Sequence, residues 1–253
     1  MSSPRIGCRK GDIVEAEPLL RRGRYLVRHA RPGADIAAAQ ALRGRAFGRG
    51  GADVDPMDPL CRHVLVESVA GGAPLACFRY LWLDSGSFIG TSYSAQYYDL
   101  TRLTEFAQPM LELGRFCIRP GKTDPDILRL GWAAIAGLVD RGGAGMLFGC
   151  ASFQGTDPVP YAPAFAHLAH RGAPARWRIG RKAPETVALV PGGETRAGLK
   201  LMPPLLRTYL SMGGWVSDHA VCDHAMGTLH VFTGVEVALI PPARARALRA
   251  LSS

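Results

Sequence analysis

A carboxylate and a guanidinium lie three residues apart in the segment Glu112-Leu113-Gly114-Arg115-Phe116. A carboxylate in a partly apolar cleft can act as a general base, because burial raises its pKa toward the useful range. Arginine can bind a second carboxylate through two parallel hydrogen bonds, or it can hold Glu112 in place. Glu112 and Arg115 are therefore candidate catalytic residues, and both interpretations of Arg115 stay open.

Residues 110–118 form a largely apolar run that predicts a β-strand. Side chains of a regular strand alternate between its two faces, so Glu112 and Arg115 would point to opposite sides. They can serve one site only where a bulge interrupts the strand, and glycine is the residue that permits one. We therefore predict a bulge at Gly114.

Charged residues also recur upstream of this segment. By composition, Asp53, Asp55 and Asp58 could form a calcium-binding loop. An EF-hand, however, would need a glutamate at position 64, which is Val64. The aspartates are then either loop acids that orient nearby arginines, or a contact for a positively charged substrate. The upstream positions are Arg43 and Phe47, then Asp53, Asp55 and Asp58, and finally Arg79.

The histidines and cysteines do not indicate a metal site. The six cysteines include no C-x-x-C pair, and several lie in apolar runs, where free cysteine behaves as a small buried side chain. A reducing compartment fits this usage. The histidine separations match no common zinc pattern, so we expect no metal. The histidines concerned are His63, His167, His170, His219 and His224.

Length and composition predict an ordinary soluble globular protein, with one large domain or at most two small ones. The chain has 253 residues, of which 47% are hydrophobic and 20% charged. We expect an N-terminal extension over residues 1–23 and a single domain over residues 24–253. The sequence contains neither a signal peptide nor an apolar run of about 18 residues, so we expect a cytoplasmic protein without a membrane span.

The formal net charge of +9 favours acidic partners, such as an acidic carrier protein or an anionic lipid surface. Nucleic acid is a third possibility, and it predicts arginines interleaved with aromatic residues on one exposed element. No such stripe is present, so we expect no nucleic-acid partner.

Periodicity predicts a mixed α+β fold. Asp35 is the expected cap of the first helix, and Asp124-Pro125-Asp126 opens the second. The turn between Ile118 and that second helix could hold a phosphate on backbone N–H groups. The expected strands are 24–30, 63–69, 75–83, 110–118, 146–151, 228–232 and 235–240, and the expected helices are 35–47, 124–140, 162–169 and 204–212.

These motifs, in this order, resemble a known family. Further matching segments are Tyr93-Ser94-Ala95, the run from Phe148 to Asp157, and Met202–Leu210 followed by Gly213-Gly214. The pattern resembles the acyl-homoserine lactone synthases, a branch of the GNAT acyltransferase superfamily. It is more similar to the first-step enzymes of ornithine lipid synthesis, which N-acylate the α-amine of ornithine from a 3-hydroxyacyl carrier protein.

The resemblance implies a GNAT-like fold with a mixed, mostly antiparallel central sheet, flanking helices and a C-terminal extension of the same domain. It implies no tightly bound cofactor, with acyl-phosphopantetheine on acyl carrier protein as co-substrate. The usual coenzyme A loop is not clear in Arg119-Pro120-Gly121-Lys122-Thr123, which favours the carrier protein. The implied site consists of Glu112 and Arg115 as catalytic residues, with Arg43, Phe47, Asp53, Asp55, Asp58, Arg79, Ser152 and Phe153 binding substrate.

The implied product is lyso-ornithine lipid, which places the enzyme at the inner face of the cytoplasmic membrane as a peripheral protein. Two alternatives remain open. One is the same chemistry on glutamine or another amino acid, and the other is a signal synthase of the homoserine-lactone type. His230 stands where the family tends to have an acidic residue, and we assign it no role.

Overall fold

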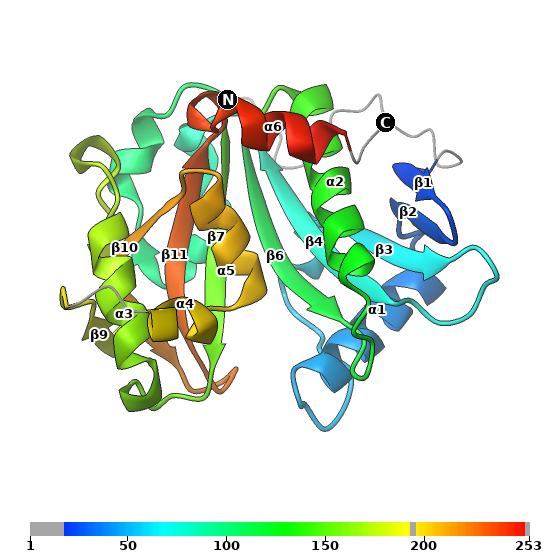
Figure 1. The fold of residues 1–253 in the computed structure, drawn as a ribbon, viewed down its shortest axis with the longest axis horizontal. Helices are drawn as coiled ribbons and strands as arrows, with labels where there is room; N and C mark the ends of the chain where they lie inside the picture. The colour runs from blue at the N-terminus through cyan, green and yellow to red at the C-terminus, as the bar shows by residue number, and fades with distance from the viewer. Residues whose placement is uncertain (1–17, 193–195, 251–253) are drawn as a thin grey trace, which may run out of the picture. The chain divides into compact units, whose positions relative to one another are not determined.

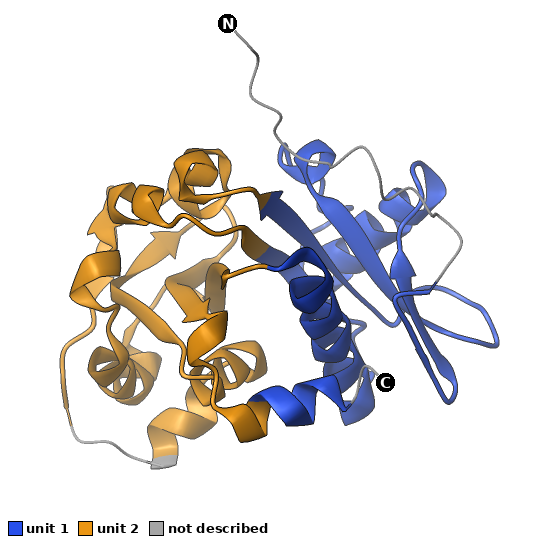
Figure 2. Cartoon of the chain, turned by 90° about the horizontal axis from the view of Figure 1, so that it is seen from above, with its two compact units in different colours: residues 1–82, 113–143, 245–253 blue, residues 83–112, 144–244 orange. Residues whose placement is uncertain are grey.

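The computed structural model describes residues 18–192 and 196–250 (Figure 1). These residues divide into two compact units, coloured separately in Figure 2. Unit 1 comprises residues 1–82, 113–143 and 245–253, and unit 2 comprises residues 83–112 and 144–244. The expected N-terminal extension lies outside the described residues as far as residue 17. Its last residues contain a short strand, β1 (Leu20–Arg22).

Unit 1 is built on strands in the order β1-β2-β3-β4-β6. The first four are joined as antiparallel neighbours, and β3 and β4 form a hairpin whose turn contains Gly71 and Gly72, both with positive φ. The expected strands 24–30, 63–69 and 75–83 are thereby confirmed. The elements are β2 (Tyr25–His29), α1 (Ala34–Ala46), β3 (Arg62–Ser68), β4 (Ala76–Leu83), β6 (Met110–Ile118), α2 (Pro125–Gly142) and α6 (Pro242–Arg249).

The two helices of unit 1 that the sequence predicted begin differently. Asp124 caps α2 as expected, since its side chain accepts a hydrogen bond from the Asp126 N–H at 2.9 Å. The expectation that Asp35 caps α1 is wrong. Gly33 occupies the cap position with φ of 85°, a conformation that favours glycine, and Asp35 instead accepts hydrogen bonds from Arg28.

Unit 2 continues the sheet in the order β6-β7-β11-β10-β9. β6 and β7 pair in parallel, as expected for strands joined through a helix, and the other neighbours are antiparallel. The elements are β7 (Met146–Gln154), α3 (Ala162–Leu168), β9 (Thr186–Ala188), α4 (Arg196–Leu201), α5 (Pro204–Ser211), β10 (Trp215–Asp223) and β11 (Thr228–Glu236), with β5 (Tyr98–Asp99) and β8 (Gly180–Arg181) forming a separate pair.

The end of unit 2 differs from the sequence prediction. The two strands expected at 228–232 and 235–240 are one strand, β11, followed by a short 3₁₀ turn (Val237–Leu239). Gly234 does not break the strand, because its missing side chain leaves room for the Trp215 ring on β10. β10 itself was not predicted, since a register shift between Val216 and Ala220 disturbs its alternation.

Each unit contains its own cluster of buried apolar side chains. In unit 1, Leu42 of α1 packs with Leu65 and with Cys77 and Cys117 of neighbouring strands. In unit 2, α3 and α5 pack against the sheet through side chains such as Phe165. Across the described residues, no helix is both long and apolar enough to cross a membrane.

Candidate active site

Glu112 lies in the part of β6 that belongs to unit 2, where it pairs with Phe148 of β7. Its side chain is buried, with 4% of its surface exposed. One carboxylate oxygen accepts a hydrogen bond from the Tyr93 N–H at 2.8 Å. The other accepts two from Ser94, the backbone N–H at 2.8 Å and the hydroxyl at 2.6 Å. A buried carboxylate is thus held in one orientation by three donors.

The surroundings of Glu112 come from three segments that carry the family resemblance, residues 93–95, 148–157 and 202–210. Ser94 lies in the first segment, and its hydroxyl is also 3.5 Å from the Cys150 sulfur on β7. Tyr209 of α5 is fully buried, and burial first, with the negative charge of Glu112 second, raises the pKa of its hydroxyl. Motifs far apart in the sequence therefore meet around one carboxylate.

Arg115 lies three residues further along β6, in unit 1, and has a left-handed backbone with φ of 53°. It is the one non-glycine residue with positive φ among the residues described. The predicted departure from a regular strand is therefore present, but the left-handed residue is Arg115 and not Gly114. Such a conformation costs a residue with a side chain about 1–2 kcal/mol, so local contacts must hold it.

Those contacts belong to a closed ring of alternating charges, which we call the arginine–aspartate ring. Asp53 pairs with Arg43 at 2.9 Å and with Arg115 at 3.1 Å. Asp55 pairs with Arg115 and, at 3.1 Å, with Arg79. Asp58 closes the ring, 2.6 Å from Arg79 and bound through both oxygens to Arg43. The ring is defined by Arg43, Asp53, Arg115, Asp55, Arg79 and Asp58.

The loop that carries Asp53, Asp55 and Asp58, which we call the aspartate loop, packs against α1 through a close contact between two glycines. Gly44 packs so closely on the Gly51 carbonyl that no side chain would fit at position 44. Just beyond, the Asp53 N–H donates to the Gln40 carbonyl at 3.0 Å. The Gln40 side chain in turn donates to Asp58 at 3.0 Å. The aspartates pair with Arg43 and Arg79, as their interpretation as loop acids predicts, and substrate contact by any of these residues stays a prediction.

The Asp55 and Asp58 carboxyls of the ring are ionised at neutral pH. Burial alone would raise the pKa of the Asp58 carboxyl, but hydrogen bonds from Arg43, Gln40 and Arg79 outweigh it and hold that pKa well below its usual range. The pKa of Asp55 is lowered in the same way, with Arg79 outweighing burial. Next to Asp58, burial lowers the pKa of His63, whose Nε2 is 3.1 Å from the Asp58 carbonyl oxygen.

Known proteins resemble this chain over most of its length. An L-ornithine N(alpha)-acyltransferase of Rhodobacter capsulatus is 34% identical over 227 residues, covering 82% of this chain and 88% of the relative. One of Brucella abortus is 31% identical and covers 83% of each chain. The chain belongs to the L-ornithine Nα-acyltransferase family. Residues 39–133 match the acetyltransferase (GNAT) domain model, in agreement with the GNAT-like α+β fold and the acyltransferase activity expected from sequence.

Solved structures also align with this chain, at lower similarity. The acyl-homoserine lactone synthase LasI aligns with a TM-score of 0.40 and 12% identity, over 84% of this chain and 91% of that one. The N-acyl amino acid synthase FeeM aligns with a TM-score of 0.43 and 8% identity, over 85% and 92%. Likeness at this level carries no argument about activity.

The structure places the other predicted site residues of this acyltransferase in varied surroundings. Phe47 is partly buried against the apolar cluster of unit 1. Phe153 lies in the core of unit 2, with its ring 5.0 Å from that of Tyr161. Ser152 beside it is exposed on β7. Packing accounts for both phenylalanines, and substrate contact by any of the three stays a prediction.

The turn after β6 is occupied by the chain's own groups. Arg119 donates from its side chain to the Ala73 and Pro74 carbonyl oxygens. The Asp124 carboxylate at the start of α2 accepts hydrogen bonds from the Tyr25 hydroxyl and from Arg24. A carboxylate here repels a phosphate that would use the same N–H groups. This turn therefore offers less to a phosphate than its sequence indicated.

Proposed function

We propose that this acyltransferase transfers a 3-hydroxyacyl chain from acyl carrier protein to the α-amine of L-ornithine, giving lyso-ornithine lipid. The observation that supports the proposal most is the buried Glu112 carboxylate, held by Tyr93 and Ser94 at a position that the family resemblance marked from sequence. The names of the relatives supply the acceptor.

Glu112 acts as the general base in this proposal. The α-amine of an amino acid is mostly ammonium at neutral pH and cannot attack a carbonyl until it loses a proton. Glu112 accepts that proton, directly or through one water. Hydrogen bonds from Tyr93 and Ser94 hold the carboxylate in one orientation for this transfer.

The free amine then attacks the thioester carbonyl carbon and forms the carbon–nitrogen bond. Backbone N–H groups of β6 are the proposed donors to the oxyanion of the tetrahedral intermediate. The nitrogen loses a second proton after the attack, and collapse of the intermediate breaks the carbon–sulfur bond. Of the two protons that the ammonium loses, one protonates the phosphopantetheine thiolate and the other passes to solvent. No covalent enzyme intermediate is needed.

The arginine–aspartate ring has a positioning role in this proposal. Each aspartate has at least two arginine partners, so its charge is already compensated. An ornithine ammonium would have to compete with those arginines for Asp53, Asp55 or Asp58. The ring holds Arg115 in its left-handed conformation, and binding of the substrate carboxylate by Arg115 remains the proposed alternative to fixing Glu112.

The donor and the membrane belong to the same proposal. The net charge of +9 suits an acidic carrier protein and an anionic lipid surface. An acyl-phosphopantetheine arm brings its own thioester, so no tightly bound cofactor is required. A peripheral position at the inner face of the membrane would bring the lyso-lipid product next to its bilayer.

A direct assay tests the proposal. The protein is incubated with 3-hydroxyacyl carrier protein and single amino acids in separate reactions, and amides are identified by mass spectrometry. We expect the amide of ornithine to form fastest. An amide formed mainly with glutamine or another amino acid would replace the acceptor, and failure to form an amide with any acceptor would remove the proposed function.

A further inference from the structure

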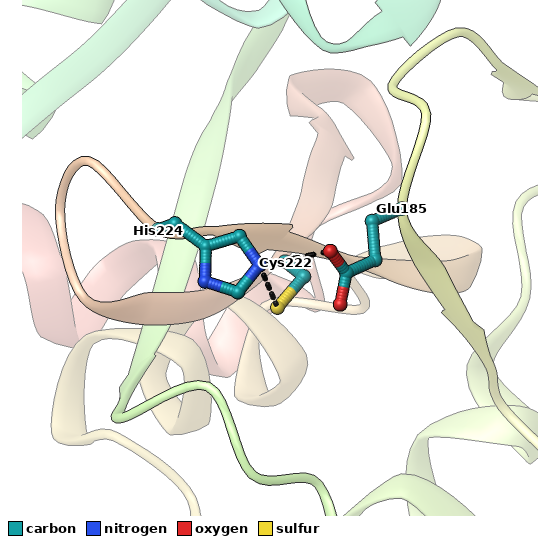
Figure 3. Close-up of side chains that lie close together, drawn as sticks. All are labelled: Glu185, Cys222 and His224. Carbon is teal, nitrogen blue, oxygen red and sulfur yellow. Dashed lines mark hydrogen bonds and ion pairs between the residues drawn. The ribbon is translucent and has the colours of Figure 1, made fainter.

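Away from Glu112, three side chains of different chemistry converge at one edge of unit 2 (Figure 3). They are Glu185, Cys222 and His224, and their ligand atoms all lie within 4.8 Å of one another. The His224 Nε2 is 2.8 Å from a Glu185 carboxylate oxygen and 3.6 Å from the Cys222 sulfur. This is the one group of its kind found in the described part of the chain.

The three side chains are arranged like ligands around a metal ion. They are not arranged like a catalytic relay, in which a carboxylate orients an imidazole that activates a nucleophile. In a relay the imidazole contacts the nucleophile through one ring nitrogen and the carboxylate through the other. Here the same atom, the His224 Nε2, faces both the thiol and the carboxylate. In a tetrahedral zinc site, ligand bonds of about 2.0–2.3 Å give ligand–ligand separations of about 3.3–3.6 Å. The sulfur–nitrogen distance matches that range, and the hydrogen bond of 2.8 Å between His224 and Glu185 would open slightly to admit the ion.

The backbone already holds the three residues together. The Cys222 N–H donates to the Glu185 carbonyl at 3.1 Å, directly before the paired segment of β9 and β10. His224 follows β10 in the turn to β11, and the Gly227 N–H donates to the His224 carbonyl across that turn. Metal binding would therefore order few additional residues.

We propose that Glu185, Cys222 and His224 form a binding site for a zinc ion. A thiolate, an imidazole and a carboxylate are all ligands that zinc accepts, and together they supply two negative charges. Binding forms the sulfur–zinc bond and releases the Cys222 proton to solvent, so zinc binding tightens as the pH rises. Three protein ligands leave a fourth position for water.

The site joins the strand edge at β9 to the β10–β11 turn. The sequence did not indicate it, because Cys222-x-His224 is not a common zinc spacing and Glu185 comes from a distant segment. The ligand set forms only when β9 pairs with β10. Zinc bound to the folded form alone would stabilise the protein by mass action.

The test uses the full chain with any purification tag removed. Zinc is titrated against a chromophoric chelator, and cobalt(II) is added separately to look for the thiolate-to-cobalt charge-transfer absorption. The variants are Cys222→Ser, His224→Gln and Glu185→Gln. The matched controls are Cys61→Ser and His170→Gln, which change the same residue types elsewhere.

We expect one zinc per chain and a cobalt charge-transfer band that Cys222→Ser abolishes. Cys222→Ser and His224→Gln should weaken zinc binding by more than about tenfold, while the controls leave it unchanged. Zinc should raise the thermal unfolding midpoint of the wild type but not of Cys222→Ser. Unchanged zinc affinity in Cys222→Ser, or a charge-transfer band that survives in it, would overturn the proposal.

Discussion

The hydrogen bonds that hold the Glu112 carboxylate come from Tyr93 and Ser94 and do not require substrate. Replacing Glu112 by glutamine therefore tests its role as a general base. We predict that Glu112→Gln lowers kcat/KM by about 100-fold to 10,000-fold, the range that general bases contribute.

The control for Glu112→Gln is Ser94→Ala, which keeps both backbone donors to Glu112 and removes one hydroxyl. Thermal unfolding establishes that both variants fold. Full activity in a folded Glu112→Gln variant would rule out the base and leave the acyl transfer itself intact.

The left-handed backbone of Arg115 leads to a second prediction for a single residue, which concerns the free energy of unfolding. Arg115→Gly relieves about 1–2 kcal/mol of strain but removes both ion pairs to Asp53 and Asp55. Breaking buried pairs costs about 3–5 kcal/mol, so we expect a net loss of about 2 kcal/mol in the free energy of unfolding. Urea denaturation measures it.

Gly114→Ala is the matched control for Arg115→Gly. A methyl group at position 114 would lie at ordinary contact distance, 3.7 Å from the Arg79 Nε. We therefore expect the free energy of unfolding to change by less than about 1 kcal/mol. If Gly114→Ala were the more destabilising of the two, the bulge would depend on Gly114, as the sequence indicated.

At the scale of elements, the arginine–aspartate ring ties α1 and the aspartate loop to β4 and β6. Asp58→Asn leaves Arg43 and Arg79 each without one charged partner in a buried position. We predict a loss of about 3–5 kcal/mol in the free energy of unfolding. The exposed pair Arg129–Asp126 is the control, and Arg129→Gln should cost less than about 1 kcal/mol. Equal losses in the two variants would contradict the ring as a stabilising unit.

His29 of β2 makes the stability of unit 1 depend on pH. Burial first, then Arg62 and Arg141, lowers the pKa of His29 to about 4, and its Nε2 lies 2.9 Å from the Tyr80 hydroxyl. As the pH falls from about 6.5, the unfolded chain binds a proton at His29 that the folded chain does not bind until about pH 4. The free energy of unfolding should therefore fall across that interval.

His29→Gln removes the titrating group and keeps a side chain that can bond to Tyr80. We expect a flatter dependence of stability on pH between about 6.5 and about 4 than in the wild type. The buried His63 contributes in the same direction in both proteins, so the difference between them isolates His29. Identical pH profiles would show that His29 titrates alike when folded and unfolded.

Sequence periodicity predicted most elements because their patterns are local. β6 matches its expected bounds, residues 110–118, and α2 begins at the expected Asp124-Pro125. β10 was missed because a register shift disturbs its pattern, and the two strands expected at 228–232 and 235–240 are the single strand β11. The cap at Gly33 was missed because Asp35 is a better N-cap type by sequence alone.

The sequence predicted which residues form the candidate site, but not which of them pair with one another. Arg43, Arg79 and the three aspartates were recognised, yet their closed ring depends on the approach of Gly44 to Gly51. The donors to Glu112 are partly backbone N–H groups of Tyr93 and Ser94, which no sequence pattern specifies. Long-range pairing determines such contacts, and single-sequence reasoning does not resolve it.

At the scale of the whole molecule, the net charge of +9 makes a prediction about the acyl donor. If the donor is an acidic carrier protein, long-range attraction accelerates encounter and added salt screens it. We expect KM for acyl carrier protein to rise several-fold between low salt and physiological ionic strength, while kcat changes little. The control is an acyl thioester of phosphopantetheine without the carrier, whose KM should respond much less to salt. Equal salt responses of the two donors would remove the carrier protein as the electrostatic partner, and the positive charge would then have to serve another surface, such as anionic lipid.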